Sequence, residues 1–556
     1  MTDLKLSRHP SFAAVEGPVV VVVMDGIGCG AHDEGDAVWR AQTPNLDWLA
    51  SATPTTRLKA HGTAAGLPSD ADMGNSEVGH NAMGAGRIFD QGAKRVNAAI
   101  AGGEIFTGAE WKRVVARVHE SGEPMHLLGL LSDGNVHSHI DHLFALIRRC
   151  HEENVGRVRV HVLLDGRDVP ETSALEYVAP LEALLAELCA AGRDYRIASG
   201  GGRMHITMDR YNADWDMVAR GWRLHVLGEG RGFAGATEAI ETLRAEDPGV
   251  ADQVLPGFVV VDGEGRPVGP IRDGASVVLL NYRGDRAIEI SRAFEEDSFA
   301  FLERGPRPDV AYAGMMQYDG DLLIPKHFLV SPPHIDRTVG EHLAHNGVAQ
   351  LACSETQKFG HVTYFWNGNR SGYFDEHSER YVEIQSDRLP FEERPWMKAA
   401  EITDAVTDEL RTGRYRHARL NYANGDMVGH TGALEAAVLA VEAVDLCLGR
   451  LIPLVRELRG ALVVTADHGN ADEMIERDKK SGSLQRHADG SPKAKTSHTL
   501  NAVPFHLFVP GREVALRTDI ATPGLANVAA TFLHLLGFAA PEYYEPSLIR
   551  RNSGDR

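Results

Sequence analysis

Six short aliphatic runs, each about the length of a β-strand, alternate along the chain with longer segments of helical periodicity. The runs lie at 19–24, 126–131, 158–164, 277–281, 462–465 and 504–509. Strands interleaved with helices are typical of α/β proteins with mostly parallel sheets. The first run is also much too short to cross a bilayer. We therefore predict an α/β fold in which these runs are buried strands.

The polar clusters that follow these runs differ between the ends and the middle of the chain. Most runs end in MDG, SDGNVHSH, DGRD, NYRGDR or TADHG, and open parallel sheets bind ligands at the carboxyl ends of their strands. Clusters near the termini carry carboxylate, imidazole and hydroxyl groups, whereas guanidinium groups dominate the middle. A chain of 556 residues also exceeds the size of a single core. We predict a metal-binding domain of residues 1–88 and 330–556, with an anion-gripping domain of residues 89–329 inserted.

The overall charge restricts the possible partners. A net charge of −20 disfavours binding to nucleic acid or to an anionic membrane, because an acidic surface gains nothing from counterion release. An enzyme of anionic substrates with this charge must concentrate positive charge locally, through metals and clustered arginines. The five cysteines are scattered without CxxC pairs, and the N-terminus lacks the apolar region of a signal peptide. Both features favour reduced thiols and a cytoplasmic protein.

Two residue pairs towards the C-terminus have the types and spacing of metal ligands. Asp426 and His430 in NGDMVGHTG stand four residues apart, which places them on one face of a helical turn. A surface ion pair is the alternative. Asp467 and His468 in VVTADHGN directly follow an aliphatic run, so that both project from the carboxyl end of a strand. A strand-terminating turn is the alternative there.

Two further residues complete a possible ligand set. Asp25 follows the first aliphatic run and precedes a glycine, a context that also suits an Asx-turn cap. His498 lies in TSHT, after a polar segment (477–497) that we interpret as a surface loop. Three aspartates and three histidines offer oxygen and nitrogen without thiolate, which matches Mn²⁺, Mg²⁺, Co²⁺ or Zn²⁺. Six such ligands, with one more from the substrate or a nucleophile, suffice for two ions, and two metals clamp the attacking and leaving oxygens of a phosphoryl displacement.

The candidate nucleophile is Ser76, in GLPSDADMGNSEVGHNAMGAGR. Glycines and small residues let the backbone approach a ligand closely. Asn-Ser-Glu is typical of a helix start, where free N–H groups and the dipole favour phosphate. Ser76 or Asn75 could also be a plain N-cap, and the two roles are compatible. A serine hydroxyl needs a base or a metal to ionise at neutral pH, and the candidate ligands supply that help.

Together these motifs resemble those of the 2,3-bisphosphoglycerate-independent phosphoglycerate mutases of the alkaline phosphatase superfamily. The resemblance covers essentially the whole chain, through MDGIG, GLPSDADMGNSEVGH, LLSDGNVHSH, LDGRDVP, NYRGDR, SETQKFGHVTYFWNG, NYANGDMVGHTG, TADHGN and TSHT. The SGGGRMHITMDRY segment and the chain length are similar to the longer plant and trypanosomatid type. The resemblance implies an alkaline-phosphatase-like metal domain with an inserted α/β transferase domain.

The resemblance also implies a role for each candidate residue. It implies one ion on Asp25, Ser76, Asp467 and His468, and a second on Asp426, His430 and His498. Ser76 would take the phosphoryl group of 3-phosphoglycerate and return it to the other hydroxyl of the retained glycerate, with Asp168 shuttling the proton. The remaining substrate contacts would come from His137 near the phosphate, from Arg167, Arg203 and Arg210 on the carboxylate and hydroxyls, and from Arg283, Arg286 and Lys358 on the phosphate.

The expected cofactors are two divalent ions, with Mn²⁺ first and Mg²⁺, Co²⁺ or Zn²⁺ as alternatives, and no 2,3-bisphosphoglycerate. The expected partner is a small phosphoglycerate, without nucleic acid or membrane, bound by a monomeric enzyme of glycolysis and gluconeogenesis. Retaining glycerate while excluding water requires closure of one domain on the other. The competing functions are another phosphomutase, phosphatase or sulfatase of the superfamily, and a metal-binding protein without catalysis.

Overall fold

The computed structural model describes residues 4–67, 69–90, 92–209, 214–318, 323–331, 335–478, 481–487 and 489–550. The chain divides into two compact units. Unit 1 comprises Met1–Gln91 and His334–Arg556, and unit 2 comprises Gly92–Pro333. Each unit has its own sheet with helices packed against it, which confirms the predicted α/β class. The predicted roles of the two parts stay predictions at this point.

The described part of unit 1 contains a seven-stranded sheet in the order β12-β11-β13-β1-β14-β15-β2. The first five strands in this order are mutually parallel, whereas β15 runs antiparallel to both β14 and β2. The strands are β1 (Val19–Met24), β2 (Thr55–Leu58), β11 (Gln350–Glu355), β12 (Glu379–Ile384), β13 (His417–Tyr422), β14 (Ala461–Thr465) and β15 (Val503–Phe508).

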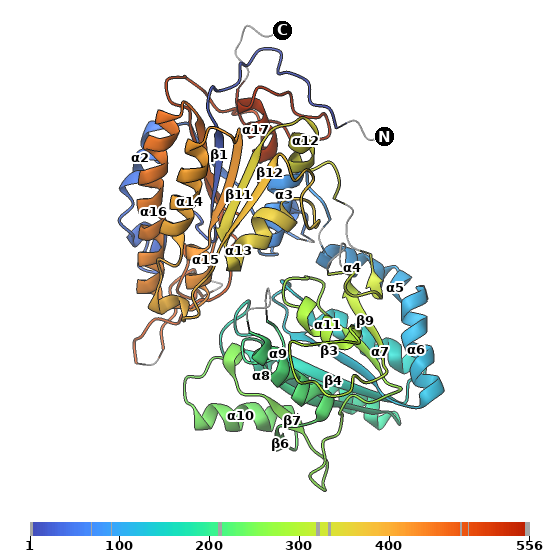
Figure 1. Ribbon diagram of the computed structural model, residues 1–556. Helices are drawn as coiled ribbons and strands as arrows, with labels where there is room; N and C mark the ends of the chain where they lie inside the picture. The colour runs from blue at the N-terminus through green and yellow to red at the C-terminus, as the bar shows by residue number, and fades with distance from the viewer. Residues whose placement is uncertain are drawn as a thin grey trace. The chain divides into compact units, whose positions relative to one another are not determined.

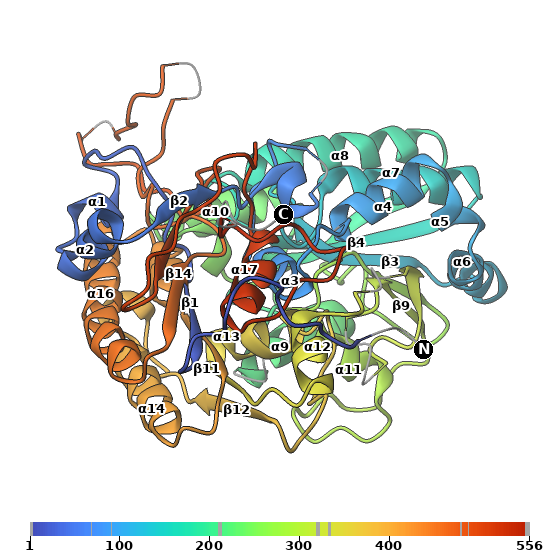
Figure 2. The ribbon, with the colours of Figure 1, turned by 90° about the horizontal axis from the view of Figure 1, so that it is seen from above.

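The central strand β1 explains how unit 1 is layered. Its six residues are all buried, and five consecutive valines favour an extended backbone because they are β-branched. Alternate side chains enter two different cores, on α14 and α16 at one face and on α12 and α17 at the other (Figures 1 and 2). The helices of this unit are α1 (Ala37–Arg40), α2 (Pro44–Ala52), α3 (Ser76–Ala85), α12 (Val339–His345), α13 (Thr356–Gly360), α14 (Ala399–Arg411), α15 (Asn424–Gly429), α16 (Leu434–Glu457) and α17 (Asn527–Leu535).

Within its described residues, unit 2 contains an eight-stranded sheet in the order β10-β9-β8-β3-β4-β5-β7-β6. The strands from β10 to β5 are parallel, and β7 turns antiparallel to β5. The strands are β3 (Met125–Leu131), β4 (Arg157–Leu164), β5 (Asp194–Gly202), β6 (Arg231–Phe233), β7 (Phe258–Val260), β8 (Ser276–Leu279), β9 (Ala311–Met316) and β10 (Phe328–Val330).

Helices cover both faces of the unit 2 sheet as well. Residues of α6, α7 and α8 share one core with β3 and β4, while α9 and α11 pack in a second core on the other face. The helices are α4 (Gly92–Ala101), α5 (Glu104–Thr107), α6 (Ala109–Ser121), α7 (Ile140–Glu152), α8 (Ala174–Ala190), α9 (Trp215–Trp222), α10 (Ala236–Glu246) and α11 (Ile288–Glu295). Across the described ranges, no helix combines the length and the apolar composition needed to cross a membrane.

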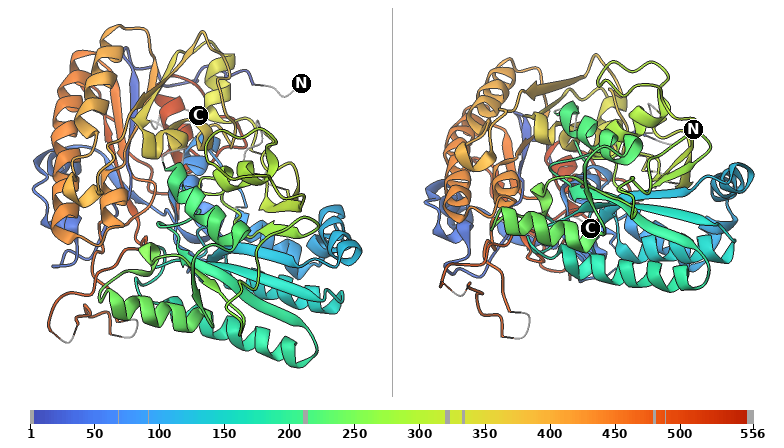
Figure 3. Two further views of the ribbon diagram at one scale, coloured as in Figure 1. Left: turned by 60° about the horizontal axis from the view of Figure 1, so that its bottom comes forward. Right: turned by 90° about the horizontal axis from the view of Figure 1, so that it is seen from below.

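All six aliphatic runs of the sequence are strands, displaced by no more than two residues at either end. Among these six runs, the exception to the expected parallel pattern is β15, which is antiparallel to its neighbours. The polar segment 477–497 folds back on itself through bridges between Arg477 and Leu484 and between Arg486 and Pro492. Figure 3 shows from two further sides how the long helices α14 and α16 (orange) lie alongside each other.

Candidate metal centre

Three aspartates lie at the carboxyl ends of three adjacent parallel strands of unit 1. Asp25 directly follows β1, Asp467 comes two residues after β14, and Asp426 lies in α15, which follows β13. Because β1 pairs in register with both β13 and β14, these ends bring the carboxylates to one buried edge of the sheet. Gly26 is required there. Its φ is +74°, and a Cβ would lie 2.5 Å from the Asp426 amide nitrogen.

Asp25, Asp467 and His468 form one buried group whose ligand atoms all lie within 4.8 Å of one another. Ser76 joins this group, since its Oγ lies 3.3 Å from Asp25 Oδ1 and 3.0 Å from His468 Nε2. Ser76 is the first residue of α3, and the side chain of Asn75 caps the helix. The serine hydroxyl therefore stands at the amino end of a ten-residue helix, where the dipole favours negative charge.

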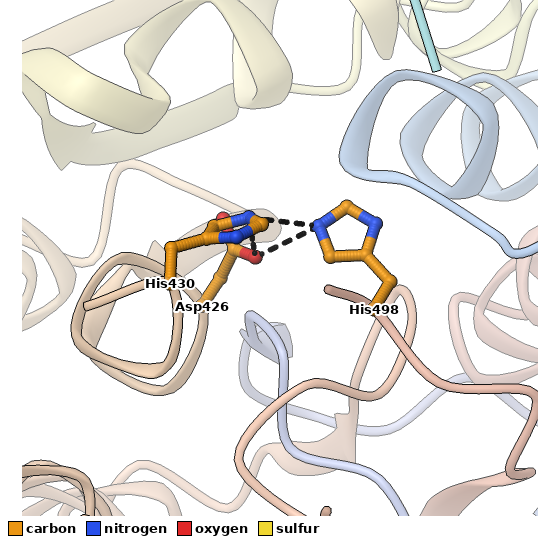
Figure 4. A group of neighbouring side chains, drawn as sticks. All are labelled: Asp426, His430 and His498. Carbon is orange, nitrogen blue, oxygen red and sulfur yellow. Dashed lines mark hydrogen bonds and ion pairs between the residues drawn. The ribbon is translucent and has the colours of Figure 1, made fainter. Parts of the chain in front are cut away.

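The second group consists of Asp426, His430 and His498, which converge in Figure 4 from one turn of helix and a separate loop. Asp426 Oδ1 lies 3.0 Å from His430 Nε2 and 3.1 Å from His498 Nε2, and the two Nε2 atoms are 3.0 Å apart. Each ring turns Nδ1 to a backbone carbonyl, at 2.6 Å for Thr496 and 2.8 Å for Gly74. Each Nδ1 must therefore carry the proton, which leaves both Nε2 lone pairs facing the carboxylate, as in metal-binding histidines.

Lys358 lies between the two groups. Its Nζ is 2.7 Å from Asp25 Oδ1, 2.7 Å from Asp426 Oδ2 and 2.5 Å from Ser76 Oγ, and its side chain is fully buried. One ammonium thus stands where several carboxylates require a cation. Within the described part of the chain, Oδ2 of the buried Asp467 makes no close hydrogen bond, and His80 Nδ1 approaches it only to 3.4 Å. This donor set of carboxylates, imidazoles and a hydroxyl fits divalent cations.

The pKa values of Asp25 and Asp426 indicate that the Lys358 ammonium alone does not compensate the charge of both carboxylates. Burial, reinforced by the neighbouring charge of Asp467, raises the pKa of Asp25 to about 7. Burial also disfavours the ionised form of Asp426, but Lys358 and His430 outweigh it and hold the pKa of Asp426 well below its usual range. Lys358 therefore does not offset the burial of Asp25 as it does that of Asp426, and divalent cations would supply the missing charge.

A second polar cluster lies at the carboxyl edge of the unit 2 sheet. It is carried by the segments that follow the adjacent strands β8, β3, β4 and β5. The predicted site residues in these segments are all buried, namely His137, Arg167, Asp168, Arg203, Arg283 and Arg286. Arg210, which was predicted with them, lies outside the described residues.

Arg203 is held by two aspartates of the segment after β4. Its guanidinium donates to Asp165 Oδ1 at 2.9 Å and also to Asp168. Asp165 Oδ1 accepts the backbone amides of Arg167 and Asp168 as well, at 3.2 and 3.0 Å. Asp165 is absent from the predicted site residues, although it directly follows β4 as Asp25 follows β1. The same strand-end signal identifies it.

His137 and Arg283 both approach Asp285, another residue absent from the predicted set. His137 Nδ1 is 3.6 Å and Arg283 Nε is 3.1 Å from Asp285 Oδ1. Arg286 donates to the carbonyl of Met208 at 2.8 Å. Burial lowers the pKa of His137 well below its ordinary value, so that its imidazole is neutral at pH 7 and can donate one hydrogen bond without adding charge.

The predicted site residues thus fall into two sets. The set in unit 1 comprises the predicted metal ligands Asp25, Ser76, Asp426, His430, Asp467, His468 and His498. Lys358 belongs to unit 1 as well, whereas Arg283 and Arg286, which were predicted to bind the phosphate with it, belong to unit 2. Two buried residues that the sequence did not single out, His80 and Asn421, contact members of the first group. The spacing of His80, one helical turn after Ser76, is the signal that could have found it.

A model of the metalloenzyme superfamily matches residues 17–540. A protein of Leptospira interrogans described as a probable 2,3-bisphosphoglycerate-independent phosphoglycerate mutase is 54% identical over 552 residues, covering 99% of this chain and all of that protein. The 2,3-bisphosphoglycerate-independent phosphoglycerate mutase of Trypanosoma brucei brucei is 52% identical, with 96% of this chain and 97% of that protein covered.

A solved structure agrees with these relatives. The phosphoglycerate mutase of Leishmania mexicana, crystallised at low cobalt concentration, matches with a TM-score of 0.96 at 51% identity, covering 99% of this chain and all of that one. The predicted resemblance is therefore confirmed over the full length, including the predicted fold. The chain belongs to the metalloenzyme superfamily and, within it, to the 2,3-bisphosphoglycerate-independent phosphoglycerate mutases.

Proposed function

We propose that this chain interconverts 3-phosphoglycerate and 2-phosphoglycerate through a phosphoserine at Ser76, without 2,3-bisphosphoglycerate. One observation carries the proposal. Ser76 Oγ stands at the start of α3 within 3.3 Å of Asp25 Oδ1, His468 Nε2 and Lys358 Nζ. A hydroxyl so placed has a helix N-terminus for an incoming phosphate and the Lys358 ammonium for its own ionised form.

The residues of unit 1 would hold two divalent cations. Asp25, Ser76, Asp467 and His468 suit one ion, and Asp426, His430 and His498 suit the other. When bound, such ions would favour the ionised serine oxygen and offset the charge of the phosphoryl group. We propose Mn²⁺ as the ion in the cell, with Mg²⁺, Co²⁺ and Zn²⁺ compatible with the same donors.

The residues of the chain would carry the first half-reaction as follows. The hydroxyl proton of Ser76 is released to solvent before the substrate enters, and the ionised Oγ, which accepts a hydrogen bond from Lys358 Nζ, attacks phosphorus. The bond between phosphorus and O3 of the substrate breaks, and Asp168 gives O3 a proton. Phosphoserine and free glycerate result.

The second half-reaction reverses these events at the neighbouring hydroxyl. Asp168 takes the proton from O2 of the retained glycerate as this oxygen attacks the phosphoserine, and Ser76 Oγ leaves in its ionised form, hydrogen-bonded to Lys358 Nζ. Asp168 is restored after each turnover, as general acid–base catalysis requires. Water must stay away from the phosphoserine throughout, because hydrolysis would make the enzyme a phosphatase.

We assign the recognition of the substrate's charges to unit 2. Arg167, Arg203 and Arg210 would bind the carboxylate and hydroxyls of the glycerate, because guanidinium forks match carboxylates in geometry. Arg283 and Arg286, with His137, would bind the phosphate, a role that we also assign to Lys358 of unit 1. In this assignment unit 1 is the metal-binding domain and unit 2 the substrate-gripping domain. We further propose that the enzyme is a cytoplasmic monomer.

The test is product analysis with purified enzyme, Mn²⁺ and 3-phosphoglycerate, without added bisphosphoglycerate. We expect 2-phosphoglycerate with almost no free phosphate, and a phosphorylated Ser76 peptide in acid-quenched samples by mass spectrometry. Chelation should abolish turnover, and restoring each divalent ion in turn should rank the metals. Release of phosphate as the main product would instead assign a phosphatase, and turnover by Ser76→Ala would remove the phosphoserine from the mechanism.

A further inference from the structure

His80 is a fully buried histidine that lies one turn after Ser76 on α3. Its Nδ1 is 2.7 Å from the carbonyl oxygen of Ser76 and 3.4 Å from Asp467 Oδ2. Its Nε2 is 3.2 Å from the side-chain nitrogen of Asn421. One imidazole thus contacts two members of the first ligand group directly.

Asn421, near the end of β13, links the same imidazole to a third member. Its Nδ2 donates to Asp25 Oδ2 at 2.7 Å and is also the atom that faces His80 Nε2. A carboxylate oxygen accepts hydrogen bonds, so the amide must turn its NH₂ towards Asp25. The second hydrogen of that NH₂ then points to His80 Nε2, which has to be the acceptor.

The amide therefore selects the tautomer of His80. With Nε2 accepting, the proton resides on Nδ1, from which it is directed to the Ser76 carbonyl and towards Asp467 Oδ2. Asp25 keeps Oδ1 for Ser76 and Lys358, because Oδ2 is taken by the amide. Hydrogen bonds of this kind orient metal-binding carboxylates before the metal arrives.

We propose that His80 and Asn421 are positioning residues for one of the two cations, namely the ion held by Asp25, Ser76, Asp467 and His468. The inference rests on the proposed function and deepens it. His80 aligns Asp467 and the backbone of Ser76, while Asn421 aligns Asp25 and fixes the His80 tautomer. Among the described residues, His80 and Asn421 make no hydrogen bond or ion pair with Asp426, His430 or His498, the proposed ligands of the other ion.

Substitutions at His80 can separate its donor from its bulk. In His80→Asn the amide nitrogen replaces Nδ1 and keeps a donor near the same place, whereas His80→Gln puts its amide nearer the position of Nε2, and His80→Ala removes both. His417→Asn is the matched control. His417 is a fully buried histidine on β13, whose Nδ1 contacts the Val19 carbonyl at 3.2 Å, away from both ligand groups.

The readout is Co²⁺ binding to metal-free protein without substrate, followed by titration calorimetry and by the visible absorption of bound Co²⁺. The parent should bind two ions. His80→Ala and His80→Gln should weaken one of them by about 10–100-fold and change its spectrum, and leave the other unchanged. His80→Asn should recover most of the lost affinity, and His417→Asn should bind like the parent.

The outcomes distinguish a failure of the proposed function from a failure of the positioning role alone. A parent that binds fewer than two ions would overturn the proposed function itself. A parent with two ions and His80 variants of equal affinity would overturn only the positioning role, as would a His417→Asn variant that loses metal as His80→Ala does. Should the His80 variants fail to fold by circular dichroism, the near-isosteric Asn421→Leu replaces them, and unchanged affinity of both ions in this variant would equally contradict the inference.

Discussion

The two sheets of this protein carry polar sites at the same structural position but with opposite charge. In unit 1, adjacent parallel strands end in Asp25, Asp426 and Asp467, gathered around a single ammonium. In unit 2, adjacent parallel strands end in a site where arginines outnumber the aspartates among the predicted residues. The carboxyl edge of a parallel sheet positions residues from distant segments whatever their chemistry.

The difference shows how an acidic protein can act on an acidic substrate. With a net charge of −20, the surface as a whole repels phosphoglycerate, so attraction has to be local. The site of unit 1 would provide it by binding cations, because it sets three carboxylates against one ammonium. In our proposal, unit 2 would provide it directly through guanidinium groups. Unit 1 should therefore depend on metal and unit 2 should not, and four measurements test this contrast.

The largest expected effect is that of Asp426→Asn in unit 1. This change removes the carboxylate of the second ligand group, and turnover should fall by about 10³-fold or more, since a metal contributes several kcal/mol to the transition state. Metal analysis after dialysis should find one tightly bound ion in place of two. An Asn variant that keeps both ions at parental affinity would break the assignment of this group.

Asp168→Asn in unit 2 should slow turnover by about 10²–10⁴-fold, the usual contribution of a general acid–base. Because Asp168 lies in the other unit, both ions should remain bound with parental affinity. Asp133→Asn is the control, an exposed aspartate in the segment after β3, and it should turn over normally. Loss of metal from the Asp168 variant would contradict the separation of roles.

Arg203→Lys should have a smaller effect, mainly on KM. The lysine keeps the charge but loses the planar guanidinium, whose Nη1 donates to both Asp165 and Asp168. The KM for 3-phosphoglycerate should therefore rise about 10-fold, which is close to the free-energy contribution of one charged hydrogen bond. Arg196→Lys, at an exposed position of the same strand β5, should leave KM unchanged. If both variants behave alike, the guanidinium geometry of Arg203 is not what binds the substrate.

Chelation should change stability in unit 1 alone. Ligands stabilise the folded state by mass action, by about 2.7 kcal/mol at a hundred times Kd, and hydrogen exchange should therefore speed up in the peptides 417–430 and 461–472. The corresponding strand ends of unit 2, peptides 157–168 and 194–203, should exchange at the same rate with and without metal. Equal acceleration of exchange in both units would show that unit 2 depends on metal as much as unit 1 does.

Much of the unit 1 site could be anticipated from local patterns. The valine run of β1, followed by Asp25 and Gly26, predicts a buried strand that ends in a carboxylate and a tight turn. The spacing of Asp426 and His430 predicts one helical face, and their ligand atoms lie 3.0 Å apart. The helix start at Asn75 and Ser76 was also predicted, and the structure makes Asn75 the cap.

Other features depended on contacts that no local pattern contains. Lys358 was predicted on the phosphate with the arginines, yet its ammonium lies among the aspartates, because α13 follows β11 two strands away from β1 in the same sheet. A lysine carries a compact charge on a flexible stem, so its sequence motif does not reveal which anions it will meet. The position of Asp165 at a strand end is visible in the sequence, but its pairing with Arg203 is not, because Arg203 comes from the next strand of the sheet.

The sequence by itself determined six of the strands, the residue types that stand at their ends and the enzyme family to which the chain belongs. These follow from short-range periodicity, β-branching and motif identity, all of which are local in the chain. The tertiary structure alone decided the antiparallel direction of β15, the place of Lys358 and the tautomer of His80. These depend on strand order and on hydrogen bonds between residues hundreds of positions apart, such as His80 with Asn421, and such pairings are selected by packing the whole sheet rather than by any one segment.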